Sequence, residues 1–143
     1  MFLGQYSHAL DSKGRLTVPA RFREELEAGL VMTQGYEPCL LVYPQTSWMA
    51  LAQKVAQMSA ASSMARSYAR LIFGNAFEAI PDKMGRILIP TVLRDYAGIQ
   101  EEAVVVGVNS YIEVWSPIRW RETMEHDYEN LPNILAEVAH MGI

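Results

Sequence analysis

A chain of 143 residues can form one ordinary domain or two very small intertwined ones. Hydrophobic residues make up 50% of it and charged residues 20%, a globular balance that excludes wholesale disorder. The net charge is −4, which argues against a polyanion partner, but the charge is unevenly distributed. Residues 1–75 carry seven basic and five acidic side chains, whereas residues 76–143 carry five and eleven. Any polyanion partner should therefore contact the N-terminal half.

The apolar runs are too short for a membrane protein. The longest, Ala103–Val108 and Cys39–Tyr43, fall far below the roughly 20 residues that span a bilayer. The N-terminal residues lack the basic region of a signal peptide. Cys39, the single cysteine, cannot form an internal disulfide, and its apolar neighbours predict a buried thiol. These features predict a cytoplasmic protein with no membrane partner.

The first part of the chain predicts strand, turn, strand and short helix. Tyr6–Leu10 is a strand, and the Asp11-x-x-Gly14 sequence is a turn signal, because Asp accepts from nearby amides and Gly adopts a positive φ. The strand that returns from Arg15 predicts a hairpin. A proline then opens the helix Pro19–Leu26. Gly29 ends this helix, and two strands follow, Leu30–Gln34 and Cys39–Tyr43.

The same order recurs after a predicted helical hairpin at residues 49–75. The second series comprises strand Phe77–Ile80, turn Asp82–Gly85, helix Pro90–Tyr96 ended by Gly98, and strands Ala103–Val108 and Ile112–Trp115. The C-terminal part predicts two helices, residues 117–128 and a segment whose apolar residues have helical spacing: Ile134, Leu135, Val138 and Met141.

The two series are an internal repeat. Asp11–Arg23 aligns with Asp82–Arg94 at an offset of 71, with identical Asp, Gly, Arg, Pro and final Arg. At an offset of 72, the residues Leu40, Val42, Tyr43 and Trp48 match Ile112, Val114, Trp115 and Trp120. Two copies are too few for a solenoid, so we expect a pseudo-twofold α+β pair. The expected units are residues 5–48, a linker at 49–75, residues 76–120, and a helical tail at 121–143.

Several motifs make the chain resemble a known family. The segments are Met1–Gly4, Leu10–Leu16, Val18-Pro19, Leu40–Pro44 with Trp48, and the second turn Asp82–Arg86. Together they resemble the MraZ family of bacterial regulators over nearly the whole chain. The resemblance implies two AbrB-like swapped-hairpin units, a ring-shaped homo-oligomer, and association with the nucleoid. It also implies binding to repeated double-stranded DNA sites, with repression of the protein's own operon of cell-division and cell-wall genes.

The candidate DNA-binding residues are Arg15, Lys13, Arg86, Arg21, Arg23 and His8. For Arg15 and Arg86 two interpretations stay open: an ion pair with the Asp four residues earlier, or a guanidinium presented to phosphate or to a guanine edge. Met84 and Val92 replace Lys13 and Arg21 in the second copy, which predicts a smaller role there. We assign the turn-structuring roles to Asp11, Gly14, Asp82 and Gly85.

The sequence predicts no enzyme. The glycines follow neither the P-loop nor the dinucleotide pattern, and no nucleophile motif occurs. His8, His126 and His140 lack partners at ligand spacing, so we expect no metal, cofactor or small-molecule substrate. Trp48 and Trp120 are interpreted as packing residues. The alternatives are a structural ring that binds protein without nucleic acid, and an antitoxin-type regulator with the same hairpin fold.

Overall fold

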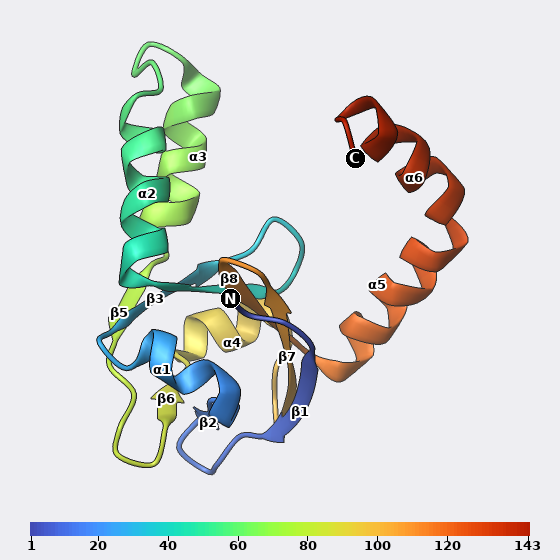
Figure 1. The fold of residues 1–143 in the computed structure, drawn as a ribbon. Coiled ribbons are helices and arrows are strands. Elements are labelled where there is room, and N and C mark those ends of the chain that lie inside the picture. Colours follow the sequence, from blue (N-terminus) through green and yellow to red (C-terminus); the bar gives the residue numbers. More distant parts are fainter.

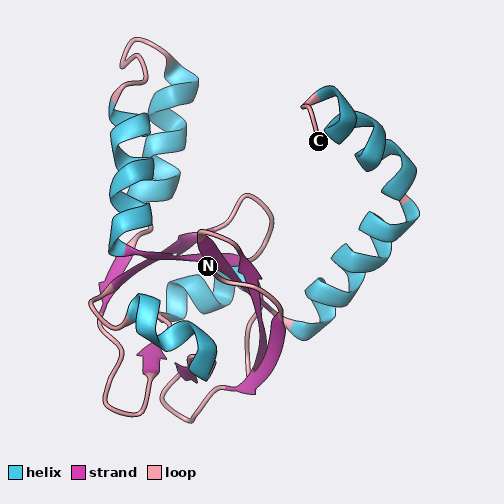
Figure 2. Cartoon of the chain, viewed as in Figure 1, coloured by secondary structure: helices cyan, strands magenta, loops and turns pink.

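The computed structural model describes the whole chain, Met1–Ile143, and confirms the α+β class (Figures 1 and 2). The first half contains β1 (Gln5–Ala9), β2 (Arg15–Thr17), the 3-10 helix η1 (Ala20–Phe22), α1 (Arg23–Leu26), β3 (Leu30–Gln34), β4 (Leu40–Pro44), α2 (Gln45–Ala56) and α3 (Ser63–Gly74). The second half contains β5 (Phe77–Ala79), β6 (Arg86–Leu88), α4 (Thr91–Ala97), β7 (Glu102–Val108), β8 (Tyr111–Trp115), α5 (Pro117–Glu129) and α6 (Leu131–His140). The two halves therefore repeat one order of elements.

The main sheet joins the two copies of the repeat. Its six antiparallel strands have the order β1–β7–β8–β4–β3–β5, so each copy adds its first strand to the other copy's pair. At the centre, β4 of the first copy pairs with β8 of the second, and Leu41 lies opposite Glu113. Leu40 faces Val114 and Val42 faces Ile112, a register that is symmetric about the central pair. The strand pairing thus has pseudo-twofold symmetry.

A second, two-stranded sheet is formed by β2 and β6, one strand from each copy. Arg15 lies opposite Leu88, Leu16 opposite Ile87, and Thr17 opposite Arg86. We call this pair the β2–β6 ribbon. In Figure 1 it lies below the main sheet, on the side away from the α2–α3 pair.

The hairpin expected within each copy is only partly formed. The chain does reverse at Asp11–Arg15, where the Asp11 amide donates to the Arg15 carbonyl at 3.0 Å. Beyond an isolated bridge between Leu10 and Leu16, however, β1 and β2 do not pair with each other. The other copy offers longer partners, because β7 provides five register positions for β1. The turn signal therefore predicted the reversal correctly and the pairing wrongly.

The predicted prolines and glycine form the boundaries of the short helices. Pro19 and Pro90 precede η1 and α4 with extended ψ angles of 137° and 145°, so each ends a strand and begins a helix. Gly98 ends α4 with φ of 67°, the left-handed conformation that glycine adopts without steric cost. The first helix differs from the prediction for Pro19–Leu26, because it divides into η1 and α1.

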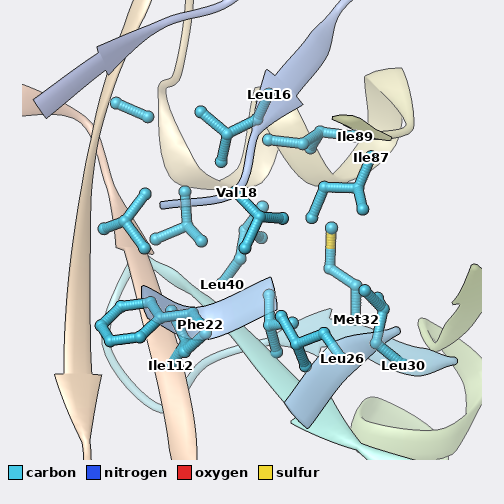
Figure 3. Packing of buried hydrophobic residues seen from close by; sticks show 14 of the residues in the cluster. Leu16, Val18, Phe22, Leu26, Leu30, Met32, Leu40, Ile87, Ile89 and Ile112 are labelled. Carbon is cyan, nitrogen blue, oxygen red and sulfur yellow. The ribbon is translucent and has the colours of Figure 1, made fainter. Parts of the chain in front are cut away.

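The main core lies between the ribbon and the six-stranded sheet (Figure 3). Leu16 and Val18 point into it from the first copy, and Ile87 and Ile89 from the second; each is at most 3% exposed. Phe22 packs edge-on against the Phe2 ring, with centroids 5.2 Å apart. Truncating a buried phenylalanine of this kind to Ala costs about 3–5 kcal/mol. The core therefore fixes one face of the ribbon and leaves its other face free.

Two helix pairs extend from this core. The α2–α3 hairpin rises from one end of the sheet, and α5 and α6 form a curved arm on the other side (Figure 1). Trp48 packs against Phe73 at 5.4 Å and Trp120 packs against Trp115 at 5.7 Å, which confirms the packing role expected of both. The chain contains no helix with the length and apolar character to cross a membrane.

Candidate nucleic-acid interface

The outward face of the β2–β6 ribbon carries two arginines, one from each copy. Side chains alternate along a strand, and Leu16 and Ile87 occupy the inward positions. Arg15 and Thr17 of β2 and Arg86 and Leu88 of β6 occupy the outward positions. The register places Arg15 and Arg86 diagonally across the ribbon. A ribbon of two strands has dimensions that fit the major groove of DNA.

Asp11 organises the first turn. Its Oδ1 accepts from the amides of Lys13 at 3.0 Å and Arg15 at 2.9 Å, and its Oδ2 accepts from Nε of Arg15 at 2.7 Å. The Arg15 amide, the guanidinium of the same residue and the Lys13 amide all stabilise the charged carboxylate. These contacts lower the pKa of Asp11 below its ordinary value, because hydrogen bonds to the charged form favour ionisation.

Asp82 makes the same contacts in the second turn. The amides of Met84 and Arg86 each donate to Oδ1 at 2.9 Å, and Nε of Arg86 donates to Oδ2 at 2.8 Å. The Arg86 amide is again the largest cause of a lowered Asp82 pKa. The turn-capping interpretation of both aspartates therefore agrees with the geometry of the two turns.

The ion pairs do not use all of either guanidinium. In both arginines Nε is the guanidinium nitrogen that donates a hydrogen bond to the aspartate, and the two terminal nitrogens of each have no hydrogen-bond partner within the chain. The side chains of Arg15 and Arg86 are 30% and 28% exposed. The ion pair holds each guanidinium in one orientation while its terminal nitrogens stay available. Arginine presents such nitrogens in pairs to phosphate or to the guanine edge. The two interpretations of these arginines are thus compatible.

Gly14 and Gly85 are required by the shape of the turns. Their φ angles are 79° and 76°, values that residues other than glycine rarely adopt. Their carbonyls also bind the other copy: the Ile89 amide donates to Gly14 at 3.0 Å, and the Val18 amide donates to Gly85 at 2.8 Å. Each turn is therefore bonded to the strand that leaves the opposite turn.

Comparisons with known proteins identify the family of a chain with this ribbon. A family model described as "MraZ protein, putative antitoxin-like" matches twice, over residues 1–71 and 72–139. A protein named Transcriptional regulator MraZ from Thermomicrobium roseum is 46% identical over 97% of this chain and 98% of its own. Proteins of the same name from Moorella thermoacetica and Pediococcus pentosaceus are 47% identical over 85% of both chains and 40% identical over the full length of both. The chain belongs to the MraZ family.

Each segment matched by the MraZ model contains one Asp-x-x-Gly-Arg turn. Asp11–Arg15 lies in the first segment and Asp82–Arg86 in the second. The duplicated motif on which the resemblance was built therefore coincides with the duplicated family match. In the folded chain both copies of the motif reach the same ribbon.

The other predicted residues of this MraZ chain lie at different distances from the ribbon face. Lys13 is exposed at the tip of the first turn, and Arg21 is exposed on η1; neither has an ion-pair partner. Arg23 donates from Nε to the Val18 carbonyl at 2.9 Å, so part of its guanidinium serves the fold. His8 lies on β1, half-buried on the same side as Tyr6, which packs on the core. The ribbon thus brings together Lys13, Arg15 and Arg86, and leaves out His8.

Sequence reasoning missed two basic residues beside the ribbon. Lys83 is exposed in the second turn, next to the Met84 that replaces Lys13. Arg94 lies on α4 and reaches the first turn from the second copy. The repeat alignment already paired Arg94 with Arg23, so a signal for it existed. Lys83 could have been found from the sequence only by counting the charged residues of the whole second turn.

A separate polar cluster lies where the loop before β4 meets β8. Glu37, Cys39 and Glu113 place their ligand-type atoms within 4.8 Å of one another. Burial raises the pKa of the Cys39 thiol far above its ordinary range, as expected of a thiol with no cation beside it. Burial also raises the pKa of Glu113, although Nε1 of Trp115 donates to its Oε1 at 3.1 Å. Both shifts favour protonated side chains.

Proposed function

We propose that this chain is a transcriptional regulator that binds double-stranded DNA through the outward face of the β2–β6 ribbon. The relatives carry the name Transcriptional regulator MraZ. The single observation that carries the DNA contact is the pair of arginines, Arg15 and Arg86, held on one ribbon face by their aspartates. Oriented arginine nitrogens on a ribbon suit base edges in the major groove.

The local charge supports a DNA contact in spite of the acidic total. The ribbon and its two turns carry four basic side chains, Lys13, Arg15, Lys83 and Arg86, against two aspartates. Both aspartates accept hydrogen bonds from the arginines themselves. The negative charges lie elsewhere, since α5 alone carries four acidic residues. We assign phosphate contacts to Lys13 and, by the same exposure, to Arg21 and Lys83.

We further propose that the two copies are AbrB-like swapped-hairpin units, at residues 5–48 and 76–120. Residues 49–75 then form a helical linker and residues 121–143 a helical tail. The support is the exchange of partners, since β1 pairs with β7 and β2 with β6. Neither copy on its own forms a sheet that covers both faces of its core. The two copies together are therefore the folding unit.

The same proposal includes a closed homo-oligomer that binds repeated promoter sites. One ribbon offers few charges, and each phosphate contact adds a modest increment to affinity. Several ribbons on one assembly would multiply these increments. The arm α5–α6 supports such an assembly: α6 has no buried residue, and Leu135 is 59% exposed on it. A ring that represses its own cell-division and cell-wall operon, in the cytoplasm and at the nucleoid, is the form that we propose.

The test of this function is salt dependence on defined DNA. Gel-shift titrations would use the duplex upstream of the chain's own gene and a scrambled duplex of equal composition. We expect preference for the upstream duplex and a steep loss of affinity between roughly 50 and 200 mM salt, because phosphate contacts release counterions. If the chain binds neither duplex, the alternative of a structural ring that binds protein would be favoured. If the chain binds neither duplex but forms a complex with a partner toxin, an antitoxin role would be favoured.

A further inference from the structure

An arginine of the second copy covers the first turn. A Cβ atom at Gly14 would lie 2.9 Å from Cζ of Arg94 and 3.1 Å from its Nε, so the guanidinium lies directly on the glycine backbone. Nε of Arg94 donates to the Ile89 carbonyl at 3.0 Å, and the Ile89 amide donates to the Gly14 carbonyl at 3.0 Å. Arg94, Ile89 and Gly14 therefore form a closed set of contacts across the two copies.

The second turn is covered in the reciprocal way. A Cβ atom at Gly85 would lie 2.6 Å from Nε and 2.9 Å from Cζ of Arg23, which belongs to the first copy. Nε of Arg23 donates to the Val18 carbonyl at 2.9 Å, and the Val18 amide donates to the Gly85 carbonyl at 2.8 Å. The two sets of contacts correspond residue by residue under the repeat alignment. One such contact could be incidental, but two equivalent ones indicate a common role.

We propose that Arg94 and Arg23 are positioning residues, each of which holds the DNA-contacting turn of the other copy. This inference rests on the proposed DNA function. Arg94 holds the turn that carries Lys13 and Arg15, and Arg23 holds the turn that carries Lys83 and Arg86. Arg94 thus serves the basic N-terminal half although it lies in the acidic half of the chain.

The chemistry of the contact requires a flat guanidinium. Arg94 uses Nε for the Ile89 carbonyl and a terminal nitrogen for Oγ1 of Thr91 at 3.0 Å, so its plane is fixed over Gly14. A lysine has the same charge but a single ammonium on a flexible chain, and it cannot cover the glycine in this way. Loss of the cover would let the turn rotate, and Arg15 would lose its orientation. The expected defect is therefore in discrimination between DNA sequences rather than in general attraction to DNA.

Fluorescence anisotropy with the full chain tests the inference. The probes are the duplex upstream of the chain's own gene and a scrambled duplex of equal composition. The variants are Arg94→Ala, Arg94→Lys and, as a control for the lost charge, Arg70→Ala, an exposed arginine on α3 far from the ribbon. We expect Arg94→Ala and Arg94→Lys to lower affinity for the upstream duplex about tenfold or more, and affinity for the scrambled duplex by less than about twofold. Arg70→Ala should match the wild type.

Three outcomes would overturn the inference. Full affinity of Arg94→Lys would show that Arg94 acts by charge alone. Equal losses of Arg94→Ala on both duplexes, with a shallower salt dependence, would show a phosphate contact. Unchanged affinity of Arg94→Ala would show no role. A wild type without preference for the upstream duplex would instead refute the DNA function itself, and the inference with it, so the two failures are distinguishable.

A thermal double-mutant cycle tests the contact without DNA. Gly14→Ala should couple to Arg94→Ala, because removing the guanidinium removes the clash with the new methyl group while the strain of the positive φ stays. Gly14→Ala should be additive with Arg23→Ala, which lies in the same copy but touches the other turn. Gly85→Ala should show the reverse pattern. Coupling within each copy, or none at all, would contradict the reciprocal contacts.

Discussion

Arg15 lies opposite Leu88 across the β2–β6 ribbon, and Arg86 lies opposite Thr17. On the outward face, the cross-strand neighbour of each arginine is therefore a residue of the other copy. Leu88, the last residue of β6, is an apolar side chain on the outward face and is 54% exposed. An apolar side chain beside an arginine suits a base step in which a thymine methyl adjoins a guanine. The surface proposed to read DNA therefore belongs to neither copy alone.

Lys13 should contribute attraction to DNA without sequence preference. It is exposed at the turn tip and has no ion-pair partner, which is the position of a phosphate contact. We expect Lys13→Ala to weaken binding to upstream and scrambled duplexes by equal factors and to reduce the salt slope by about one unit per subunit engaged. Anisotropy titrations at several salt concentrations measure both quantities. Ser12→Ala, at the neighbouring exposed position, is the matched control; a selective loss on the upstream duplex would instead assign base contact to Lys13.

The order of elements could be predicted from the sequence, because it depends on local signals. Pro19 ends a strand and begins a helix wherever the rest of the chain lies, and the repeat doubles the evidence at Pro90. The partners of β1 and β2 could not be predicted in the same way. The signal at Asp11 and Gly14 specifies a reversal, but the strand that lies opposite is chosen by burial of residues far away in the chain.

The candidate site could be predicted only in part for the same reason. Alternation along the strand placed Arg15 outward and Leu16 inward, as the structure shows. The difference in charge between the two copies predicts a smaller contribution to DNA binding from Arg86 than from Arg15. The register places Arg86 on the same face, with equivalent contacts and similar exposure. Arg94 was missed because its contact with Gly14 crosses between copies, and no local pattern encodes such a contact.

Glu113 should lower stability at neutral pH. Burial raises its folded-state pKa above the ordinary value of 4.5, so folding favours the protonated acid. Its contribution is therefore most favourable below the ordinary pKa and is lost as pH rises through the raised value. We expect Glu113→Gln to raise the thermal midpoint at pH 7, with the gain shrinking as pH falls towards about 4. Gln keeps an acceptor for the Trp115 indole.

Thermal unfolding monitored by circular dichroism across this pH range checks the Glu113 prediction. Glu24→Gln, an exposed substitution on α1, controls for the change in net charge. A midpoint gain for Glu113→Gln that does not vary with pH would contradict the pKa argument.

The apolar face of α6 should support assembly. Leu135 is exposed on a helix that has no buried residue in the single chain, and exposed apolar surface of this kind is typical of an interface. We expect Leu135→Glu to reduce the oligomer to smaller species while the thermal midpoint of the fold changes little. Light scattering on size-separated protein measures the mass. Ala136→Glu, on the opposite side of α6, should leave the oligomer intact; a monomeric wild type of 16.1 kDa would contradict the assembly proposal.

The most direct test of the DNA-binding ribbon is anisotropy on upstream and scrambled duplexes with wild type, Arg15→Ala and Arg86→Ala. We expect Arg15→Ala to abolish preference for the upstream duplex with the oligomer intact, because a bidentate base contact is worth about 1–3 kcal/mol and the loss recurs in every subunit engaged. Arg86→Ala should lose less, since Met84 and Val92 stand in its copy where the first copy has Lys13 and Arg21. Equal losses would show that both copies contribute alike. Unchanged preference in both variants would contradict the account.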